Sequence, residues 1–351
     1  GLPVIAVILG TTSRGYRWSR LEESPLFRFL LPSIPETAEP GFEYRVYVGY
    51  DMGDLFYDSE GRRAQALEWF RRNVTAPMAK RGIPARMVLL EFVNLLHKPG
   101  PIFNFLGEAA FVDGADYVYR VNDDTEFRTP WAGPFVDALD RYDPPRLGVI
   151  GPYCPEGNMR ILTHDFVHRT HWLIFQIYYP VVLSDWWMDD WISKVYPRAN
   201  TLRHLDVLVH HHTWATGGGG DPVRYRVDHR HEKFLSLELK QGAVAISKFR
   251  NMHCSQGSAA QPGHLIACRL PDGHITPRWS GMAKSAARFS LTWSRRKAPG
   301  GSGYTDSSDD YSSWSTELPT IGGGWDEDED DDSDSNSGLV WSGLKRVGHD
   351  E

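Results

Sequence analysis

The chain has 351 residues, of which 41% are hydrophobic and 24% charged, and its formal net charge at pH 7 is −7. This length and composition suffice for one large α/β core or two small ones, and they exclude a chain that is disordered throughout. Residues 301–351 hold fourteen acidic and two basic residues, so residues 1–300 carry a small positive excess. Because those basic residues are not gathered into a run, we expect no nucleic-acid partner.

Three cysteines lack the spacing of a zinc knuckle and allow at most one disulfide, with Cys254 and Cys268 the nearest pair. The early apolar run Val4–Leu9 is too short to cross a bilayer and fits a strand. The chain enters this strand almost directly after Gly1. We therefore expect any signal or membrane anchor to lie upstream of this sequence. If such an anchor was lost, the expected location is the Golgi or secretory lumen, and otherwise the compartment stays open.

Strand and helix patterns alternate along the chain. Apolar β-type runs predict strands over residues 3–9, 42–50, 86–93, 117–121, 146–151 and 205–211. Helical spacing predicts helices over residues 62–73, 101–113, 131–141 and 232–239. This alternation predicts an α/β domain over residues 1–250, with a mostly parallel twisted sheet and helices on both faces. Residues 251–351 lose the periodicity, and we expect a low-complexity, largely disordered acidic tail.

The strand that begins at Tyr117 ends in Asn122, Asp123 and Asp124. Open α/β sheets bind ligands beyond the carboxyl ends of their strands, and two carboxylates with a carboxamide at such an edge suit a hard divalent cation. A nucleotide diphosphate is a poor leaving group unless a cation bridges its oxygens. The same composition is also typical of turns and helix caps, so a metal site and a turn are both open interpretations.

Two adjacent carboxylates, Asp189 and Asp190, stand among indoles in the run Trp186–Trp191. Transfer of a sugar to a hydroxyl needs a carboxylate that accepts the hydroxyl proton, and apolar surroundings raise the pKa of such a group. The nearby aromatic side chains suit stacking on sugar rings. The alternative is that one of the two aspartates caps a short helix and that the aromatics belong to the core.

A later strand runs through Val207 and Val209 into the triplet 210–212, which consists of three histidines. Alternation along a strand puts His211 on the same face as the two valines, so His211 reaches the site if the valines point toward it. The surrounding acidic and histidine residues match no zinc motif, and a surface cluster without a role is the alternative. The glycine run 217–220 is more typical of a flexible loop than of a phosphate cradle.

Taken in order, these motifs resemble the GT-A type nucleotide-diphospho-sugar glycosyltransferases. The motifs that carry the resemblance are the Thr12-Ser13-Arg14 loop, the acidic strand end at Asp51, Asn122-Asp123-Asp124, Asp189-Asp190-Trp191, and a histidine followed by Arg224-Tyr225. The nearest match is a group of uncharacterised eukaryotic members with a chondroitin-galactosaminyltransferase-like arrangement. The resemblance covers about Val4 to Phe249 and leaves the tail outside.

The resemblance implies a role for each matching residue. Asp124, with Asn122 and His211, would bind the Mn²⁺ or Mg²⁺ that bridges the donor diphosphate, although the family usually has an acid where this chain has Asn122. Contacts to the nucleotide donor would come from Arg14, Asp51, Asp123 and Arg224. The carboxylate that deprotonates the acceptor would be Asp190 in the first place and Asp189 in the second.

We therefore expect a metal-dependent enzyme that moves a sugar from a nucleotide-diphosphate donor, such as a UDP-sugar, to a glycan or glycoprotein acceptor. One alternative is a metal-dependent hydrolase or pyrophosphatase that uses the same side chains on water. Another is a non-catalytic carbohydrate-binding relative, which the amide at Asn122 would suit. Incubation with nucleotide sugars and Mn²⁺ separates the transferase from the hydrolase, because only the transferase yields a glycosylated product. For the metal site, the test is Asp124→Ala, which should change both binding and turnover of the nucleotide sugar.

Overall fold

In the computed structural model, the described residues are 1–93, 97–185, 187–213 and 229–254. The strands are β1 (Val4–Thr11), β2 (Glu43–Asp51), β3 (Ala85–Phe92), β4 (Tyr117–Arg120), β5 (Thr125–Phe127), β6 (Val149–Tyr153), β7 (Asp165–His168) and β8 (Thr201–His211). The α-helices are α1 (Leu31–Thr37), α2 (Glu60–Phe70), α3 (Ala76–Lys80), α4 (Pro99–Val112), α5 (Ala132–Asp140), α6 (Thr170–Phe175), α7 (Trp187–Val195) and α8 (Glu232–His253). Short 3₁₀ or π turns are η1 (Leu21–Glu23), η2 (Leu26–Leu30), η3 (Arg71–Thr75), η4 (Arg198–Asn200) and η6 (His229–His231).

The strands form an eight-stranded sheet in the order β3-β2-β1-β4-β7-β6-β8-β5. β1 pairs in parallel with β2 and β4, and β2 pairs in parallel with β3. β7 is antiparallel to both of its neighbours, and β5 is antiparallel to β8. Six of the eight strands in the described part of the chain therefore run in one direction, and the predicted mostly parallel sheet is confirmed.

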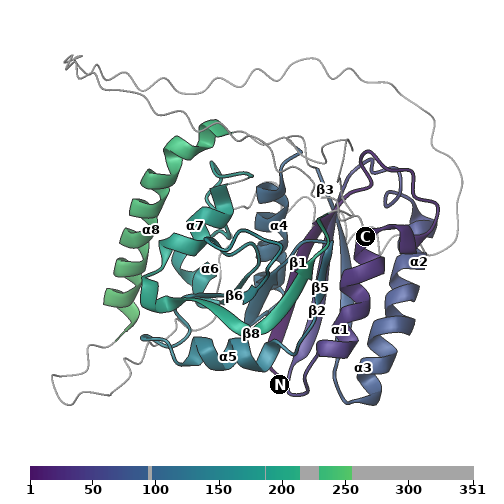
Figure 1. The fold of residues 1–351 in the computed structure, drawn as a ribbon, viewed down its shortest axis with the longest axis horizontal. Coiled ribbons are helices and arrows are strands. Elements are labelled where there is room, and N and C mark those ends of the chain that lie inside the picture. Colours follow the sequence, from purple (N-terminus) through teal and green to yellow (C-terminus); the bar gives the residue numbers. More distant parts are fainter. Residues whose placement is uncertain (94–96, 186, 214–228, 255–351) are drawn as a thin grey trace, which may run out of the picture. The chain divides into compact units, whose positions relative to one another are not determined.

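Two apolar layers cover the two faces of the sheet. Alternate residues of β1 divide between them: Val7 points toward the layer that contains α1, α2 and α5, and Ile8 points toward the layer that contains α4, α6, α7 and α8. Figure 1 shows α1, α2 and α3 on one side of the strands and α4, α6, α7 and α8 on the other. Since both faces are buried, β1 is an apolar run rather than an alternating one, as is typical of a central parallel strand.

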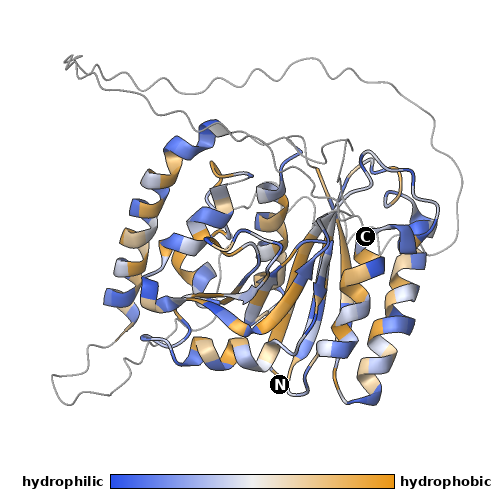
Figure 2. Cartoon of the chain, in the orientation of Figure 1, coloured by the Kyte–Doolittle hydropathy of each residue, from blue (hydrophilic) through white to orange (hydrophobic). Residues whose placement is uncertain are grey.

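Hydropathy follows the same division. The strands and the sheet-facing sides of the helices are mostly hydrophobic, and the outward sides of α2 and α8 are mostly hydrophilic (Figure 2). Within the described ranges, no helix has the length and apolarity that a membrane crossing requires. The observed helices on both faces of a mixed sheet confirm the predicted α/β fold class.

Several predicted boundaries differ from the observed ones. β6 begins at Val149 rather than at residue 146, because Arg146 adopts a left-handed backbone with φ of 64° that no strand accommodates. α8 runs on to His253 instead of ending at 239. It passes through Gly242, where a Cβ would lie 2.3 Å from Val195 of α7, so the missing side chain allows the two helices to touch.

The sequence patterns missed the antiparallel strand β7 and the short helices α1 and α6. The helix α7 is the short helix that was the alternative interpretation for Asp189 and Asp190. The expected domain boundary at residue 250 lies inside the last turn of α8. From residue 255 onward, the expected acidic tail lies outside the described residues. Cys254, directly after α8, is disulfide-bonded, and Cys154 is a buried free thiol.

Candidate functional site

The carboxyl ends of β1, β2 and β4 lie side by side. In register, Thr11 of β1 stands opposite Tyr50 of β2, and Ile8 of β1 stands opposite Arg120 of β4. The segments that follow these strands are 12–14, 52–54 and 121–124, and they therefore leave the sheet at one edge. This is the edge at which open α/β sheets bind ligands.

The centre of the candidate site is a contact between Asp124 and His211. Asp124 Oδ1 lies 2.9 Å from His211 Nε2, and the side-chain nitrogen Nδ2 of Asn122 lies 3.2 Å from the same imidazole atom. The backbone holds the contact in place, because β5 pairs with β8 so that Thr125 stands opposite His211. In addition, the amide of His212 donates to the carbonyl of Asp124 at 2.9 Å.

The three consecutive histidines have different partners. Val207 and Val209 are buried in the apolar layer that contains α1, α2 and α5. Because side chains alternate along a strand, His211 lies on the same face of β8 as these two valines, as predicted. The ring of His210 lies 2.7 Å from Glu156. The ring of His212 lies 2.8 Å from Glu126 and stacks on Phe29 with ring centroids 3.8 Å apart. His211 is thus the histidine whose ring faces the Asn122–Asp124 segment.

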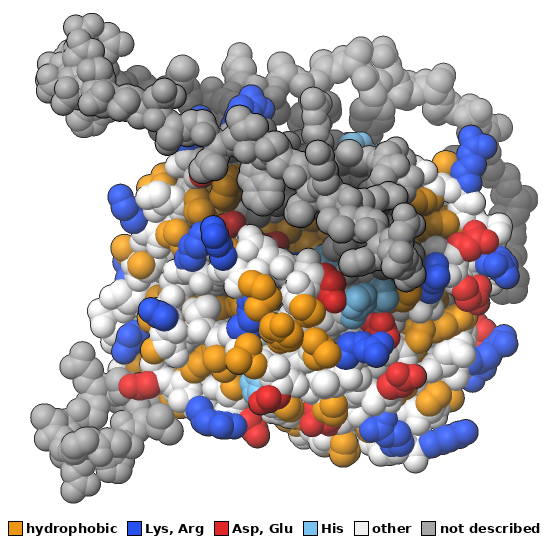
Figure 3. Space-filling model, in the orientation of Figure 1, with side chains coloured by type: hydrophobic (Ala, Val, Ile, Leu, Met, Phe, Trp, Pro, Cys, Tyr) orange, Lys and Arg blue, Asp and Glu red, His pale blue; other side chains and the backbone are white. Residues whose placement is uncertain are grey.

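Two opposing effects act on the pKa of the His211 ring. Burial disfavours the charged imidazolium, but the hydrogen bond to Asp124 and the charges of Asp124 and Asp123 outweigh it, so the pKa of His211 is raised. The same negative charges would equally favour a bound cation. Figure 3 shows histidine side chains gathered with carboxylates on one face of the molecule.

Asp123 contacts the end of β1. It is buried, and its Oδ2 accepts a hydrogen bond of 2.7 Å from the hydroxyl of Thr11 at the end of β1. The Thr11 hydroxyl also lies 3.4 Å from the phenol of Tyr57. Asp123 therefore links the β4 segment to the loops that follow β1 and β2.

The β1 and β2 loops are joined by Asp54, to which the sequence patterns gave no role of its own. Its carboxylate is buried and accepts hydrogen bonds from the Ser13 amide at 2.7 Å, the Ser13 hydroxyl at 2.7 Å and the Thr12 hydroxyl at 3.0 Å. It also accepts from the amides of Phe56 and Tyr57 at 3.0 and 2.9 Å. In the sequence, this arrangement is indicated only by an aspartate that can accept a hydrogen bond from the backbone amide two residues later, as is common in turns.

Arg14 and Asp51, two of the four residues predicted to contact the nucleotide, form an ion pair with each other. The side chain of Arg14 is 31% exposed and that of Asp51 is 13% exposed, so the pair lies at the surface of the site rather than in the core. The structure thus brings together the ends of β1 and β2, as the resemblance implies. The fourth residue expected at the nucleotide, Arg224, lies outside the described residues.

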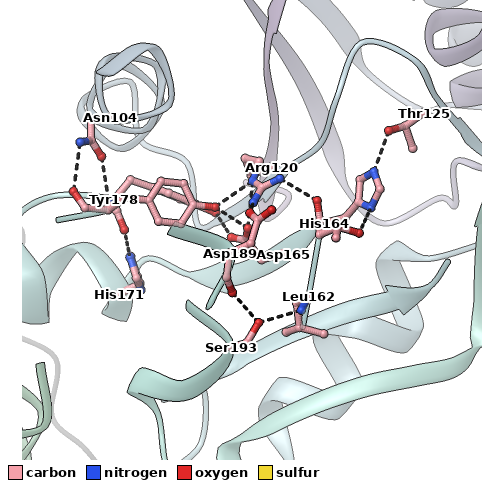
Figure 4. Close-up of polar contacts among 12 residues, drawn as sticks. Asn104, Arg120, Thr125, Leu162, His164, Asp165, His171, Tyr178, Asp189 and Ser193 are labelled. Atoms are coloured by element: carbon pink, nitrogen blue, oxygen red, sulfur yellow. Dashed lines mark hydrogen bonds and ion pairs between the residues drawn. The ribbon is translucent and has the colours of Figure 1, made fainter. Parts of the chain in front are cut away.

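The two carboxylates of α7 have separate environments. Asp189 forms an ion pair with Arg120, the last residue of β4, and Figure 4 shows the two groups in contact. Burial raises the pKa of the Asp189 carboxyl, although the Arg120 guanidinium opposes the shift. Asp190 pairs with Lys194 one turn later in the same helix, and the Lys194 side chain is 49% exposed.

A buried histidine that the sequence patterns did not single out lies behind His211. The ring nitrogen Nε2 of His164 lies 2.8 Å from the hydroxyl of Thr125 (Figure 4). Its ring stands edge-on to that of His211, with 5.3 Å between the ring centroids. Burial holds the pKa of His164 well below its usual value, so the ring is neutral. His164 therefore supports the His211 ring without adding charge.

Asp124 and His211 could hold a divalent cation only together with further ligands, such as those of a substrate. Within the described ranges, no three His, Cys, Asp or Glu side chains are arranged to hold a metal by themselves. Asp124 and His211 supply one carboxylate oxygen and one imidazole nitrogen that already lie 2.9 Å apart. Magnesium-type sites commonly use one or two carboxylates together with substrate phosphates, which agrees with so small a set.

No protein-family model matches the chain, and no curated protein matches it. Among solved structures, three of S. aureus TarS show a distant similarity to it. One has 14% sequence identity and a TM-score of 0.40, over 59% of this chain and 36% of TarS. A second, TarS 1–349 in complex with UDP, has 13% identity and a TM-score of 0.42, over 69% of this chain and 65% of that one.

A third, TarS 1–349, has 14% identity and a TM-score of 0.39, over 70% of this chain and 72% of that one. The chain therefore spans about a third of the longer TarS structure. These values describe a distant likeness, which says nothing about the ligand or the reaction of this chain.

Proposed function

We propose that the chain is a glycosyltransferase that moves a sugar from a nucleotide-diphosphate donor, such as a UDP-sugar, to a glycan or glycoprotein acceptor. The observation that carries the proposal is the contact of Asp124 with His211 at the carboxyl end of β4. It places a carboxylate and an imidazole beside the loops of β1 and β2, at the edge where this sheet type binds ligands. The narrower likeness to a chondroitin-galactosaminyltransferase-like arrangement stays a prediction from the order of the motifs.

Asp124 and His211 would hold the metal ion, with Asn122 beside them. Mn²⁺ suits the set better than Mg²⁺, because Mg²⁺ prefers oxygen ligands and one of the two donors here is an imidazole nitrogen. When bound, the cation would neutralise charge on the departing diphosphate. Asp123 keeps the segment in place through its hydrogen bond with Thr11.

The nucleotide would lie against the loops after β1 and β2. Arg14 and Asp51 offer a guanidinium for phosphate oxygens and a carboxylate for ribose hydroxyls or the base. Their mutual ion pair holds both groups at the surface of the site before the donor arrives. Asp54 fixes the backbone beneath them through the Ser13 amide. We propose Arg224 as a further donor contact on the sequence motif alone.

Asp190 is our choice for the base that accepts the acceptor proton, and Asp189 is the second choice. Asp189 is engaged by the buried Arg120, whereas Asp190 forms an ion pair with the half-exposed Lys194, which an acceptor sugar can displace. As the acceptor oxygen bonds to the anomeric carbon, its proton passes to Asp190, and the bond from that carbon to the diphosphate oxygen breaks. A single displacement of this kind inverts the anomeric centre.

The disulfide at Cys254 supports the proposal that the protein works in an oxidising compartment such as the Golgi or secretory lumen. An enzyme that modifies glycans or glycoproteins would meet its acceptors there.

The test is a panel of nucleotide sugars, first by thermal shift with and without Mn²⁺ and then by turnover with glycan acceptors. A ligand that binds the folded state raises the melting temperature, so the true donor is expected to raise it in the presence of Mn²⁺. Glycosylated product together with free nucleotide diphosphate would support the transferase. Cleaved donor without product under any acceptor would overturn it in favour of a hydrolase or pyrophosphatase.

A further inference from the structure

Arg120 is the last residue of β4 and stands two positions before Asn122, with only 1% of its surface exposed. Each nitrogen of its guanidinium has a partner. Nε lies 2.8 Å from the phenol oxygen of Tyr179 and 3.0 Å from Asp165 Oδ2, Nη1 donates to the carbonyl of Thr163 at 2.6 Å, and Nη2 pairs with Asp189 (Figure 4). A fully buried cation is thus surrounded by acceptors from three separate segments.

The surroundings hold the guanidinium firmly. The rings of Phe103 and Tyr179 lie 5.1 and 5.6 Å from its central carbon. Asp165 is fully buried and also accepts hydrogen bonds from the phenols of Tyr178 at 2.7 Å and Tyr179 at 2.5 Å. One side of Arg120 is therefore locked by Asp165 and the tyrosines, and the other side reaches α7.

On that other side, Arg120 fixes the start of α7. The Asp189 carboxylate is bound to the guanidinium. The backbone carbonyl of Asp189 accepts a hydrogen bond of 2.6 Å from the hydroxyl of Ser193. The same hydroxyl accepts a hydrogen bond of 2.7 Å from the amide of Leu162. Consecutive helix residues are rotated by a fixed angle of about 100°. Since Asp189 is anchored, the direction in which Asp190 leaves the helix is set as well.

We propose that Arg120 is a positioning residue that ties the metal-binding segment after β4 to the catalytic carboxylate on α7. The inference rests on the proposed function, in which Asp190 accepts the acceptor proton. One rigid side chain would thereby keep the leaving-group end and the acceptor end of the reaction at a fixed separation. A shift of about 1 Å between reacting groups lowers the rate by up to about 100-fold, so loss of this link should slow the reaction.

The geometry asks for arginine rather than lysine. The planar guanidinium presents donors in three directions, toward Tyr179 and Asp165, toward Thr163, and toward Asp189. A lysine ammonium keeps the charge but is a compact point at the end of a flexible chain. Arg120→Lys therefore keeps a cation in the core and loosens the connection to α7.

The experiment is a double-mutant cycle of Arg120→Lys and Asp190→Asn, with kcat and KM for donor and acceptor measured on the folded full chain. We expect Arg120→Lys to lower kcat by about 10- to 100-fold with the donor KM changed less than about threefold. In the Asp190→Asn background, the same lysine should lower kcat little further, because the carboxylate that it misplaces no longer acts as a base. The matched control is Arg45→Lys, another ion-paired arginine with 14% of its side chain exposed, which lies near the start of β2 and should leave kcat unchanged.

A second variant, Asp189→Asn, breaks the same link from the helix side while Arg120 remains, and it serves if the lysine variant does not fold. Asp189→Asn should also lower kcat. When it is combined with Asp190→Asn, kcat should fall little below that of Asp190→Asn alone. An unchanged kcat in either variant, or losses that multiply in the cycle, would overturn the positioning role alone. A wild-type chain that transfers no sugar would overturn the proposed function, and this inference with it.

Discussion

His211 Nε2 and Asp124 Oδ1 lie 2.9 Å apart, although they come from the end of β8 and the loop after β4. The contact exists because the short strand β5 leaves the β4 loop and pairs with β8, with Thr125 opposite His211. A side-chain pair fixed by a strand ladder is pre-organised, as the proposed binding of a cation and a diphosphate would require.

Replacing Asp124 with asparagine should abolish cation-dependent binding of the donor. At a donor concentration about 100-fold above Kd, wild-type protein with Mn²⁺ gains about 2.7 kcal/mol, which raises the melting temperature by about 5–10 °C. We expect Asp124→Asn to lose nearly all of this shift, and EDTA to remove it from the wild-type protein. The control is Asp137→Asn, whose side chain is 71% exposed. A full shift in Asp124→Asn would show that the metal lies elsewhere.

Removing the Asp54 carboxylate should destabilise the domain. Asp54→Ala leaves the buried Ser13 amide and the Phe56 and Tyr57 amides without their acceptor, which costs about 3 kcal/mol. Urea denaturation measures the change. Asp58→Ala, which removes a more exposed carboxylate from the same loop, should cost less than about 1 kcal/mol. Equal losses in the two variants would contradict a central role for Asp54.

The buried imidazole of His171 should lower the free energy of unfolding in mild acid. Burial lowers its pKa to about 4, and the unfolded chain has the ordinary value of 6.5. Between these two values the unfolded state binds more protons, so the free energy of unfolding falls as the pH drops from 6.5 to 4, by up to about 3 kcal/mol. His168, with its pKa lowered to about 3, should act in the same direction.

Replacing His171 with glutamine removes the titrating group while an amide remains for the partners Tyr178 and Tyr196. Urea denaturation from pH 4.5 to 7.5 should give a flatter dependence on pH in His171→Gln than in the wild-type protein. Parallel curves for the two proteins would show that the ring titrates alike in both states.

A methyl group at Gly100 should displace the chain segment that precedes α7. A Cβ there would lie 2.7–2.9 Å from backbone atoms of Ser184, which cannot rotate away, so Gly100→Ala should cost about 1–3 kcal/mol. We also expect a lower kcat, since Ser184 precedes α7 by only a few residues. The control is Gly61→Ala in α2, where the nearest atom is 4.0 Å away and alanine should stabilise the helix by about 0.5–1 kcal/mol. Thermal unfolding of both variants tests the contrast.

The strands of the central sheet were readable from the sequence, because a strand buried on both faces must be an apolar run. β1, β2 and β4 appear where such runs predict them, with Asp51 as the last residue of β2 and Asn122–Asp124 shortly after the end of β4. The side of β8 that His211 occupies follows from strand alternation. These features depend on neighbours within a few residues.

Which side chains form ion pairs and hydrogen bonds with each other depended on the tertiary structure alone. The motifs indicated Asp189 and Asp190 as a pair, but only the packing of α7 against β4 gives the first to Arg120 and leaves the second with Lys194. Asp54 likewise gained its role from the Ser13 amide, which belongs to the loop of another strand.

The same division explains what the sequence determined about the protein as a whole. Local periodicity and residue type fixed the α/β class, the central strands and the acidic edge. The antiparallel insertion of β7, the full length of α8 and the buried Arg120 network were decided by contacts between residues far apart in the chain. A sequence pattern records which side chains are available at each strand end, whereas strand order and helix packing determine which of them meet.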